Sequence, residues 1–192
     1  MISQAFEGLI DAGFQGFVAA AIICHQPTIA QFGSARHTMA TEIERKFLVT
    51  DDRWKAGATG RRYRQGYLAT DSERVVRVRS VDAEAFLTIK GKVHGYSRLE
   101  FEYAIPVDDA RTMLERLCHQ PIIDKTRYRV PAGAHVWEVD EFHGENAGLV
   151  IAEIELEREG EPFERPPWLG AEVSMDPRYF NANLVAHPYQ RW

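Results

Sequence analysis

The chain has little cysteine: only Cys24 and Cys118 occur in 192 residues. Two cysteines so far apart form neither the paired spacing of a zinc site nor a disulfide framework, which excludes disulfide-stapled folds and cysteine-based metal centres. Two ordinary thiols are typical of a reducing compartment. The cysteine usage therefore predicts a cytoplasmic protein.

Long hydrophobic stretches are also missing. The most apolar run, residues 13–24, is too short to span a bilayer. The residues before it carry Glu7 and Asp11 but no Lys or Arg, which is the wrong charge for a signal peptide. The sequence MATEIERKFLV that follows is typical of the start of a folded domain. We therefore predict an N-terminal extension over residues 1–38, poorly ordered or derived from a misassigned start, and one domain over residues 39–192.

An excess of positive charge is absent, since the formal net charge is -5. This balance argues against a protein whose whole surface binds nucleic acid or an anionic membrane, although an acidic chain can contain a basic pocket. Low-complexity tracts and internal repeats are absent too, and 45% of the residues are apolar. This length and composition predict a single globular domain with a hydrophobic core.

What the sequence does contain is a period-two pattern of polar and apolar residues from Thr41 onward. Such alternation predicts antiparallel strands with one polar face. The polar positions, strand by strand, are Glu42, Glu44 and Lys46; Arg77 and Arg79; Thr88 and Lys90; Arg98, Glu100 and Glu102; Lys125, Arg127 and Arg129; Glu138 and Asp140; and Glu153, Glu155 and Glu157.

Two interpretations of these polar faces compete. An antiparallel sheet with one solvated face explains the alternation of any single strand. It explains less well why whole strands carry one sign of charge and why arginine is so frequent. Acidic strands suit a hard divalent cation and basic strands suit an anion with several oxygens. A closed barrel would direct both sets into one cavity.

Helical signals are few. Residues 107–119 place apolar side chains at helical spacing with Asp108 as the expected N-cap, and residues 178–186 predict a second, short helix. Residues 159–170 contain three prolines and are expected to form a loop.

Glu42 to Lys46 form the motif E-x-E-x-K at the start of the first predicted strand. Further motifs follow in order: RQGYL (64–68), RVR (77–79), TIKG (88–91), LEFEY (99–103), DKTRY (124–128), EVDEF (138–142), AEIELE (152–157) and VSMDPRYFNANL (173–184). Together they cover residues 41–186 and resemble the CYTH superfamily, the triphosphate tunnel metalloenzymes, and most of all its small bacterial inorganic triphosphatases. The resemblance implies a mainly β (α+β) fold: a closed antiparallel β-barrel tunnel of about eight strands, with a few covering helices and a divalent metal inside.

A metal site is the first functional consequence. Glu42 and Glu44 lie two apart on one strand, so both carboxylates face the same side. The resemblance adds Glu153 and Glu155 from a late strand. Carboxylates suit Mg²⁺, which needs few protein ligands beside water and substrate phosphates, and Mn²⁺ is the alternative. Three further acids are expected to pair with the basic residues or to bind a second metal: Glu100, Glu102 and Asp140.

A set of cations on the strands is expected to bind substrate phosphates. The candidates are Lys46, Arg77, Arg79, Lys90, Lys125 and Arg127, with Arg129 at the edge of the set. Crowding by other cations is expected to lower the pKa of Lys46, which would help to withdraw a proton from the attacking water, alone or with Tyr67. The alternative for Tyr67 is a barrel aromatic that caps a strand. Arg178 is a further candidate for substrate contact near one tunnel entrance.

The favoured function is metal-dependent hydrolysis of inorganic tripolyphosphate to pyrophosphate and phosphate. The dense cations, and the lack of an aromatic motif for binding a base, favour an inorganic polyanion. The resemblance leaves open a thiamine triphosphatase or a class IV-type adenylate cyclase, and a non-catalytic polyphosphate-binding module is an alternative of another class. A small-molecule triphosphate is the expected partner, without nucleic acid or membrane, for a monomer or homodimer.

Overall fold

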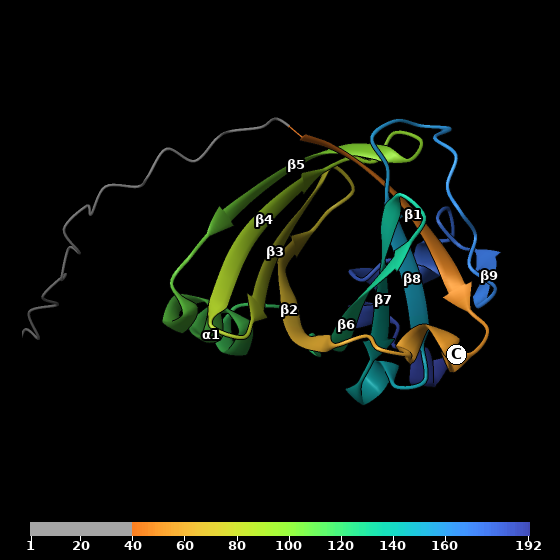
Figure 1. The fold of residues 1–192 in the computed structure, drawn as a ribbon. Coiled ribbons are helices and arrows are strands. Elements are labelled where there is room, and N and C mark those ends of the chain that lie inside the picture. The colour runs from red at the N-terminus through yellow and green to blue at the C-terminus, as the bar shows by residue number, and fades with distance from the viewer. Residues whose placement is uncertain (1–39) are drawn as a thin grey trace, which may run out of the picture. The chain divides into compact units, whose positions relative to one another are not determined.

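The computed structural model describes residues 40–192, and the extension predicted over residues 1–38 lies outside the described residues (Figure 1). Within the described part the fold is mainly β, as predicted. The strands are β1 (Ala40–Val49), β2 (Gly60–Thr70), β3 (Arg74–Val81), β4 (Glu84–Gly91), β5 (Ser97–Ala104), β6 (Ile123–Ala132), β7 (His135–Phe142), β8 (Val150–Glu155) and β9 (Leu169–Glu172). The helices are α1 (Val107–Arg116) and α2 (Asn183–Ala186), with 3₁₀ turns at Asp52–Lys55, Gly144–Asn146, Pro177–Tyr179 and Tyr189–Arg191.

The strands form one antiparallel sheet that closes on itself. Neighbouring strands follow the order β5-β4-β3-β2-β6-β7-β8-β1, and β1 pairs with β5 to complete a ring of eight within residues 40–192. Closure depends on β1, because its first half (40–43) pairs with β5 and its second half (44–48) pairs with β8. β9 lies outside the ring against β1. The predicted barrel is therefore confirmed, and every strand of the ring has an inner and an outer face.

The outer faces carry the apolar half of the period-two pattern. An aromatic-rich core on the outside of β1, β7 and β8 includes Phe47, Trp54, Trp137 and Trp168, each at most 6% exposed. The ring of Trp137 meets those of Phe47 and Trp168 edge to face, with centroids 5.6 and 5.9 Å apart, which is a geometry that aromatic pairs prefer. This packing supports the strands that carry acidic residues on their inner faces.

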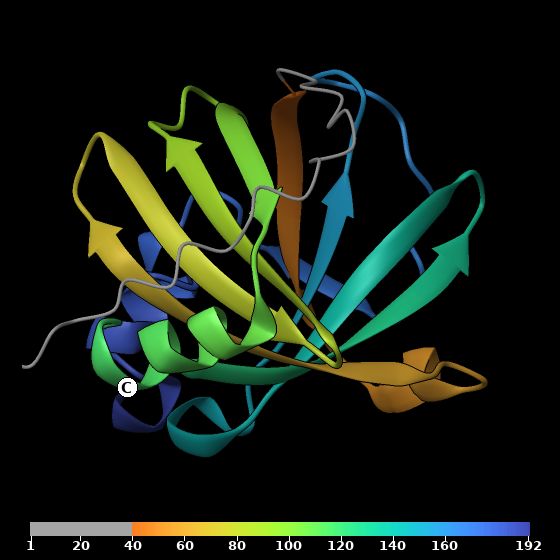
Figure 2. The same ribbon diagram turned by 90° about the vertical axis from the view of Figure 1, so that its left-hand side faces the viewer.

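Helix α1 covers the outside of the β2–β3–β4 wall (Figure 2). Its buried residues Ala110 and Leu114 pack with Cys118 against Val78 of β3 and Ala85 of β4. The apolar spacing that predicted this helix is the spacing of its buried side. Burial of this stripe, rather than helix propensity, stabilises so short a helix.

Both helices differ in detail from the prediction. The first begins at Val107 with Pro106 as its N-cap, so the expected cap Asp108 instead lies in the first turn, where its charge faces the positive end of the helix dipole. The second is shorter than predicted, because a 3₁₀ turn and the four-residue α2 share the segment. The predicted proline-containing loop extends to Leu169, where β9 begins.

Inner side chains are apolar at one end of the barrel. Tyr67, Ile123, Phe142 and Ile151 gather there and pack against Leu184 of α2. We call this cluster the apolar floor. It lies between the charged part of the interior and the C-terminal helix α2.

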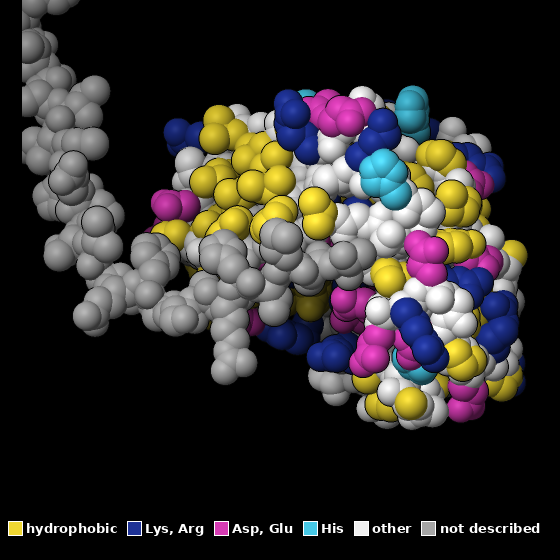
Figure 3. Space-filling model, turned by 90° about the horizontal axis from the view of Figure 1, so that it is seen from above, with side chains coloured by type: hydrophobic (Ala, Val, Ile, Leu, Met, Phe, Trp, Pro, Cys, Tyr) yellow, Lys and Arg dark blue, Asp and Glu magenta, His cyan; other side chains and the backbone are white. Residues whose placement is uncertain are grey.

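Part of the apolar outer surface is exposed to solvent. Figure 3 shows hydrophobic side chains gathered at one side of the described surface, next to charged side chains of both signs. Ile89, Val93 and Leu99, on or beside β4 and β5, are exposed members of the apolar set. No helix within residues 40–192 is long and apolar enough to cross a membrane.

Candidate functional site

The ring of strands encloses a cavity of about 860 Å³, which side chains from all eight strands line. The predicted site residues that lie along it are Glu42, Glu44, Lys46, Tyr67, Arg77, Arg79, Lys90, Glu100, Glu102, Lys125, Arg127, Arg129, Glu153 and Glu155. Asp140 is fully buried behind this lining, against Lys125 and Arg127. The polar faces are therefore turned inward, and the interpretation of a sheet with one solvated face is wrong.

The inner faces of β1 and β8 form what we call the acidic wall. Glu44 lies opposite Glu155 and Lys46 lies opposite Glu153 in the strand pairing. The ammonium group of Lys46 donates hydrogen bonds to both Glu44 and Glu153. Burial disfavours that charge, but the carboxylates of Glu153 and Glu44 outweigh burial and raise the pKa of Lys46 above its ordinary value. The expected lowering is wrong, because the neighbours of Lys46 are carboxylates rather than cations.

In two carboxylates of the acidic wall, Glu44 and Glu155, burial and neighbouring negative charges outweigh the nearby cations. Burial, and then the charge of Glu153, raises the pKa of Glu44. The pKa of Glu155 is raised as well. Its partial burial is the largest cause, followed by the negative charges of Glu42, Glu138 and Glu44. Carboxylates crowded in this way resist ionisation together, and a bound cation would relieve the repulsion.

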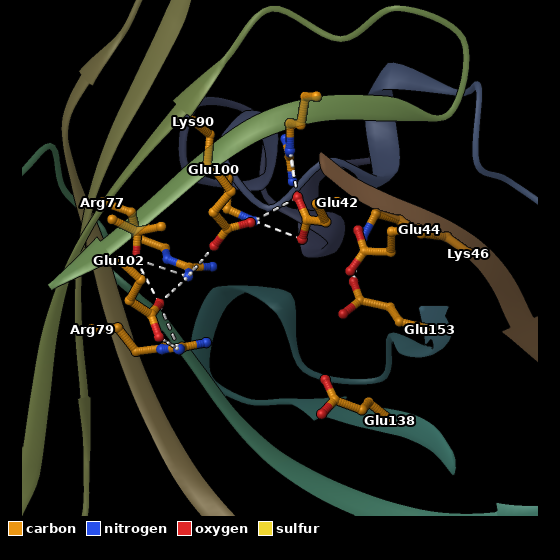
Figure 4. A network of polar contacts seen from close by, with 12 residues as sticks. Glu42, Glu44, Lys46, Arg77, Arg79, Lys90, Glu100, Glu102, Glu138 and Glu153 are labelled. Carbon is orange, nitrogen blue, oxygen red and sulfur yellow. Dashed lines mark hydrogen bonds and ion pairs between the residues drawn. The ribbon is translucent and has the colours of Figure 1, made fainter. Parts of the chain in front are cut away.

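The opposite side of the cavity, formed by β3, β4 and β5, is what we call the basic wall (Figure 4). Arg77 and Arg79 of β3 converge on Glu102 of β5. Nη2 of Arg79 lies 2.9 and 2.8 Å from the two carboxylate oxygens, and Nη2 of Arg77 lies 3.2 Å from one of them. Glu102 therefore pairs with cations, as one of its two predicted roles requires.

Glu42 connects the two walls. Its carboxylate accepts hydrogen bonds from Nζ of Lys90 at 2.9 Å and from Nε of Arg98 at 2.6 Å. Lys90 also lies 2.7 Å from Glu100. Burial alone would raise the pKa of Glu42, but Lys90 and Arg98 hold it well below its ordinary value. Glu42 is thus firmly ionised, whereas the pKa of Glu44 is shifted in the opposite direction.

Arg127 of β6 forms ion pairs with three carboxylates that lie in or beside the cavity. Its Nε and Nη2 lie 2.7 and 2.6 Å from the two oxygens of Asp140, and the guanidinium also pairs with Glu138 and Glu153. Burial opposes its charge, yet Asp140 and Glu153 hold its pKa well above the usual range. Lys125, only 2% exposed, shares Asp140. Burial, and then the charge of Arg127, lowers the pKa of Lys125 to about 8.

Tyr67 lies where the cavity meets the apolar floor. Its hydroxyl accepts a hydrogen bond from Nε2 of Gln65 at 3.0 Å. Burial raises the pKa of Tyr67 to about 12, so the phenol stays protonated near neutral pH. Among the contacts of the described residues, no hydrogen bond joins Tyr67 to Lys46, and the expected pairing of these two groups is not present.

Comparison with known proteins assigns this chain to a family. The family model of the CYTH domain matches residues 40–189, the greater part of the chain. The chain belongs to the CYTH family. A protein named inorganic triphosphatase from Acetivibrio thermocellus is 52% identical over 154 residues, covering 80% of this chain and 99% of the relative. A second inorganic triphosphatase, from Nitrosomonas europaea, is 38% identical over 153 residues, covering 76% of this chain and 97% of the relative.

Solved structures agree with the family assignment. A crystal structure of an inorganic triphosphatase superposes on this CYTH barrel with a TM-score of 0.55 at 35% identity, covering 77% of this chain and 95% of that chain. The prediction of a CYTH fold is therefore confirmed by both sequence and structure.

The acidic wall of this CYTH barrel has the chemistry that a divalent metal needs. Glu42, Glu44, Glu153 and Glu155 supply only oxygen donors, and Glu44 and Glu155 are the two whose pKa values are raised by burial and neighbouring carboxylates. As they lie, however, no three or more His, Cys, Asp or Glu side chains within the described residues converge as a metal-binding group. Instead, carboxylate oxygens of Glu44 and Glu153 accept hydrogen bonds from Lys46. The donor set fits Mg²⁺, and metal binding would compete with Lys46 for these carboxylates.

Sequence reasoning missed several residues of the site. Arg98, Glu138, Gln65 and Tyr63 all line the cavity but were not assigned a role. The period-two pattern had already placed Arg98 and Glu138 on polar faces. Gln65 and Tyr63 lie on the inner face of β2 in step with Tyr67, so the same pattern could have found them. Arg178, by contrast, does not line the cavity. It pairs with Asp176 and lies over Trp192 at the outside.

Proposed function

We propose that this CYTH protein hydrolyses inorganic tripolyphosphate to pyrophosphate and phosphate, with Mg²⁺ as its metal. The observation that carries the proposal is the charged cavity, in which a basic wall and an acidic wall face each other across a space of about 860 Å³. The two curated relatives, both named inorganic triphosphatase, support the same reaction. The predicted cytoplasmic location and the monomeric or homodimeric state stay predictions.

The basic residues are proposed to bind the phosphates. Arg77 and Arg79 offer guanidinium groups from β3, Lys90 offers an ammonium group from β4, and Lys125 and Arg127 add cations from β6. Guanidinium groups bind phosphate oxygens in pairs and keep their charge at every relevant pH. A linear triphosphate carries charge along its whole length and matches this distribution better than a ligand with a large apolar part.

The acidic wall is proposed to hold the metal through Glu42, Glu44, Glu153 and Glu155. A bound Mg²⁺ would neutralise charge on the phosphate oxygens. Lys46, whose pKa is raised by Glu153 and Glu44, would then act as a fixed positive charge beside the reacting phosphate rather than as a base. Tyr67 is protonated near neutral pH, so its hydroxyl would donate a hydrogen bond to a phosphate oxygen.

In the reaction, the oxygen of a water molecule bonds to a terminal phosphorus while the bond from that phosphorus to the bridging oxygen breaks. Pyrophosphate leaves, and the proton lost by water passes to solvent or to the leaving group. Such transfer depends mainly on positioning and on stabilising charge, which are the two tasks that the walls of this cavity can perform.

Substrate choice tests the proposal directly. Phosphate release should be fastest from tripolyphosphate when it is compared with thiamine triphosphate and ATP at equal concentrations in Mg²⁺. A preference for thiamine triphosphate, or cyclic AMP formed from ATP, would keep the fold and overturn the substrate. Tight binding of tripolyphosphate without turnover would indicate a polyphosphate-binding module.

Ligand binding should also stabilise the barrel. Arg79 is repelled by Arg77 and Arg127, and this repulsion, after burial, lowers its pKa. A polyanion placed among these groups would offset the repulsion, and a ligand present at 100 times its Kd adds about 2.7 kcal/mol to stability. We therefore expect tripolyphosphate at about millimolar concentration in EDTA to raise Tm by roughly 5–10 °C. An unchanged Tm in calorimetry would contradict binding in the cavity.

The pH profile should report Lys125. Its lowered pKa of about 8 means that the group is charged below that pH and neutral above it. Because a neutral amine binds phosphate poorly, kcat/KM for tripolyphosphate is expected to fall as pH rises through about 8. Lys125→Arg should move the fall to higher pH, since a guanidinium stays charged. A wild-type profile that is flat from about pH 7 to 10 would show that Lys125 does not bind the substrate in its charged form.

A further inference from the structure

Arg79 of the basic wall lies between two aromatic rings. Its guanidinium carbon is 5.6 Å from the centroid of Tyr63 and 5.5 Å from that of Phe86. The rings come from the strands on either side of β3. Phe86 of β4 lies directly opposite Arg79. On β2, Arg79 pairs with Gln65, and Tyr63 lies two residues before Gln65 on the same strand. Both contacts are within the range in which an aromatic face attracts a cation.

The ring of Tyr63 has a second cation beside it. The guanidinium carbon of Arg127, on β6, lies 5.5 Å from the same centroid. β2 is the strand between β3 and β6, so Tyr63 stands between an arginine of the basic wall and the most heavily paired arginine of the cavity. One aromatic ring thus contacts two phosphate-binding candidates from different strands.

Arg79 has few other restraints. Its Nη2 pairs with Glu102, but its Nε is buried and has no hydrogen-bond partner among the described residues. Arg77 and Arg127 are close enough to repel it. A cation with one carboxylate partner and two like charges nearby would be displaced or would sample several rotamers. The negative faces of the two rings oppose this, and they restrict the plane of the guanidinium group without using its N–H donors.

We propose that Tyr63 and Phe86 are positioning residues that fix the guanidinium of Arg79, and through Tyr63 its spacing from Arg127, for binding of a phosphate group. The anion named in this inference rests on the proposed function. Tyr63 lines the cavity, whereas Phe86 is not among its lining residues, so Phe86 acts only through Arg79. The N–H groups that the rings leave unoccupied are then held ready for phosphate oxygens, which reduces the ordering that binding requires.

Four variants test this inference: Tyr63→Leu, Tyr63→Phe, Phe86→Leu and the control Tyr128→Leu. Tyr128 packs on Trp54, with centroids 4.9 Å apart, outside the cavity, and its loss should cost stability without touching Arg79. Tyr63→Leu is expected to raise KM for tripolyphosphate, and its Kd in EDTA, about tenfold, which corresponds to about 1.4 kcal/mol. The change in kcat should be less than about twofold. Phe86→Leu should raise both constants about threefold.

Tyr63→Phe keeps the ring and should restore KM and Kd to within about twofold of wild type, and Tyr128→Leu should leave both unchanged. Unchanged constants in Tyr63→Leu and Phe86→Leu would overturn the inference, as would an equal loss in Tyr63→Phe, which would assign the effect to the hydroxyl group. If Tyr63→Leu does not fold, Phe86→Leu decides. If wild type binds tripolyphosphate without hydrolysing it, the proposed function fails while the Kd series still tests the two rings. If wild type does not bind it, both proposals fail.

Discussion

Replacing Glu44 with glutamine is expected to lower kcat/KM for tripolyphosphate about a thousandfold, while Tm stays at or above its wild-type value. The reason lies in the acidic wall, where burial and the charge of Glu153 raise the pKa of Glu44. An ionised Glu44 is therefore disfavoured even with its hydrogen bond from Lys46, and an uncharged amide removes the repulsion from Glu153. The same change removes a proposed metal ligand, and losing one strong electrostatic contact in an active site costs about two to three orders of magnitude.

Steady-state kinetics at saturating Mg²⁺, together with calorimetric Tm, would check both parts. Glu157→Gln is the matched control, because Glu157 also lines the cavity but is exposed at its rim. The control should keep its activity within about twofold. Activity of Glu44→Gln within about tenfold of wild type would contradict the proposed metal site. A large fall in Tm would instead show that Glu44 acts mainly by supporting the fold.

Arg127→Met is expected to lower the free energy of unfolding by about 3–5 kcal/mol. The guanidinium pairs with Asp140, Glu138 and Glu153, and its side chain is only 11% exposed. Asp140 is fully buried. Removing the cation leaves Asp140 paired with Lys125 alone and Glu153 paired with Lys46 alone. Negative charge then exceeds positive charge in a place that water reaches poorly, which is far more costly than a broken surface pair.

Urea unfolding at neutral pH would measure this loss. Arg62→Met is the matched control: Arg62 forms a two-pronged pair with Asp124 on the outside of the neighbouring strand β2, but it is well exposed. Its urea midpoint should hardly change, because solvent screens exposed pairs. The double variant Arg127→Met/Asp140→Asn should recover part of the lost stability, since it also removes one of the excess negative charges. Equal, small losses in Arg127→Met and Arg62→Met would contradict a structural role for this network.

The sequence predicted the strands of the barrel well because successive residues of a strand point to opposite faces, so each face can be recognised from alternate residues. Glu42, Glu44 and Lys46 share one face at period two, and the same rule placed Arg77 and Arg79 together. Strands of one sign of charge favoured a barrel over a solvated face, and the resemblance to the CYTH superfamily implied that the barrel is closed. The strands of the ring and the cavity are what this reasoning expected.

What the sequence could not predict is which strands face one another. Lys46 was expected among cations, but β8 brings Glu153 opposite it from 107 positions further along the chain. Register between distant strands decides whether the pKa of a buried lysine rises or falls. Lys125 has the lowered pKa instead, because burial and then Arg127, two residues further along the same strand, outweigh Asp140.

Local signals failed where tertiary packing or neighbouring residues overrode them. Asp108 was a reasonable N-cap, but the chain enters α1 through Pro106, whose fixed backbone angle places the N-cap two residues earlier. Arg178 was assigned to a tunnel entrance from its motif alone. Asp176, two residues before it, holds it at the outside by donor–acceptor pairs that the motif does not reveal.

The central claim is that the two walls of the cavity together hydrolyse tripolyphosphate with a bound metal. A ³¹P NMR time course of tripolyphosphate with the purified full chain, in Mg²⁺ and in excess EDTA, tests it most directly. We predict one pyrophosphate and one phosphate for each tripolyphosphate consumed in Mg²⁺, and no products above the enzyme-free rate in EDTA. Equal rates in Mg²⁺ and EDTA, or no consumption in either, would contradict the claim.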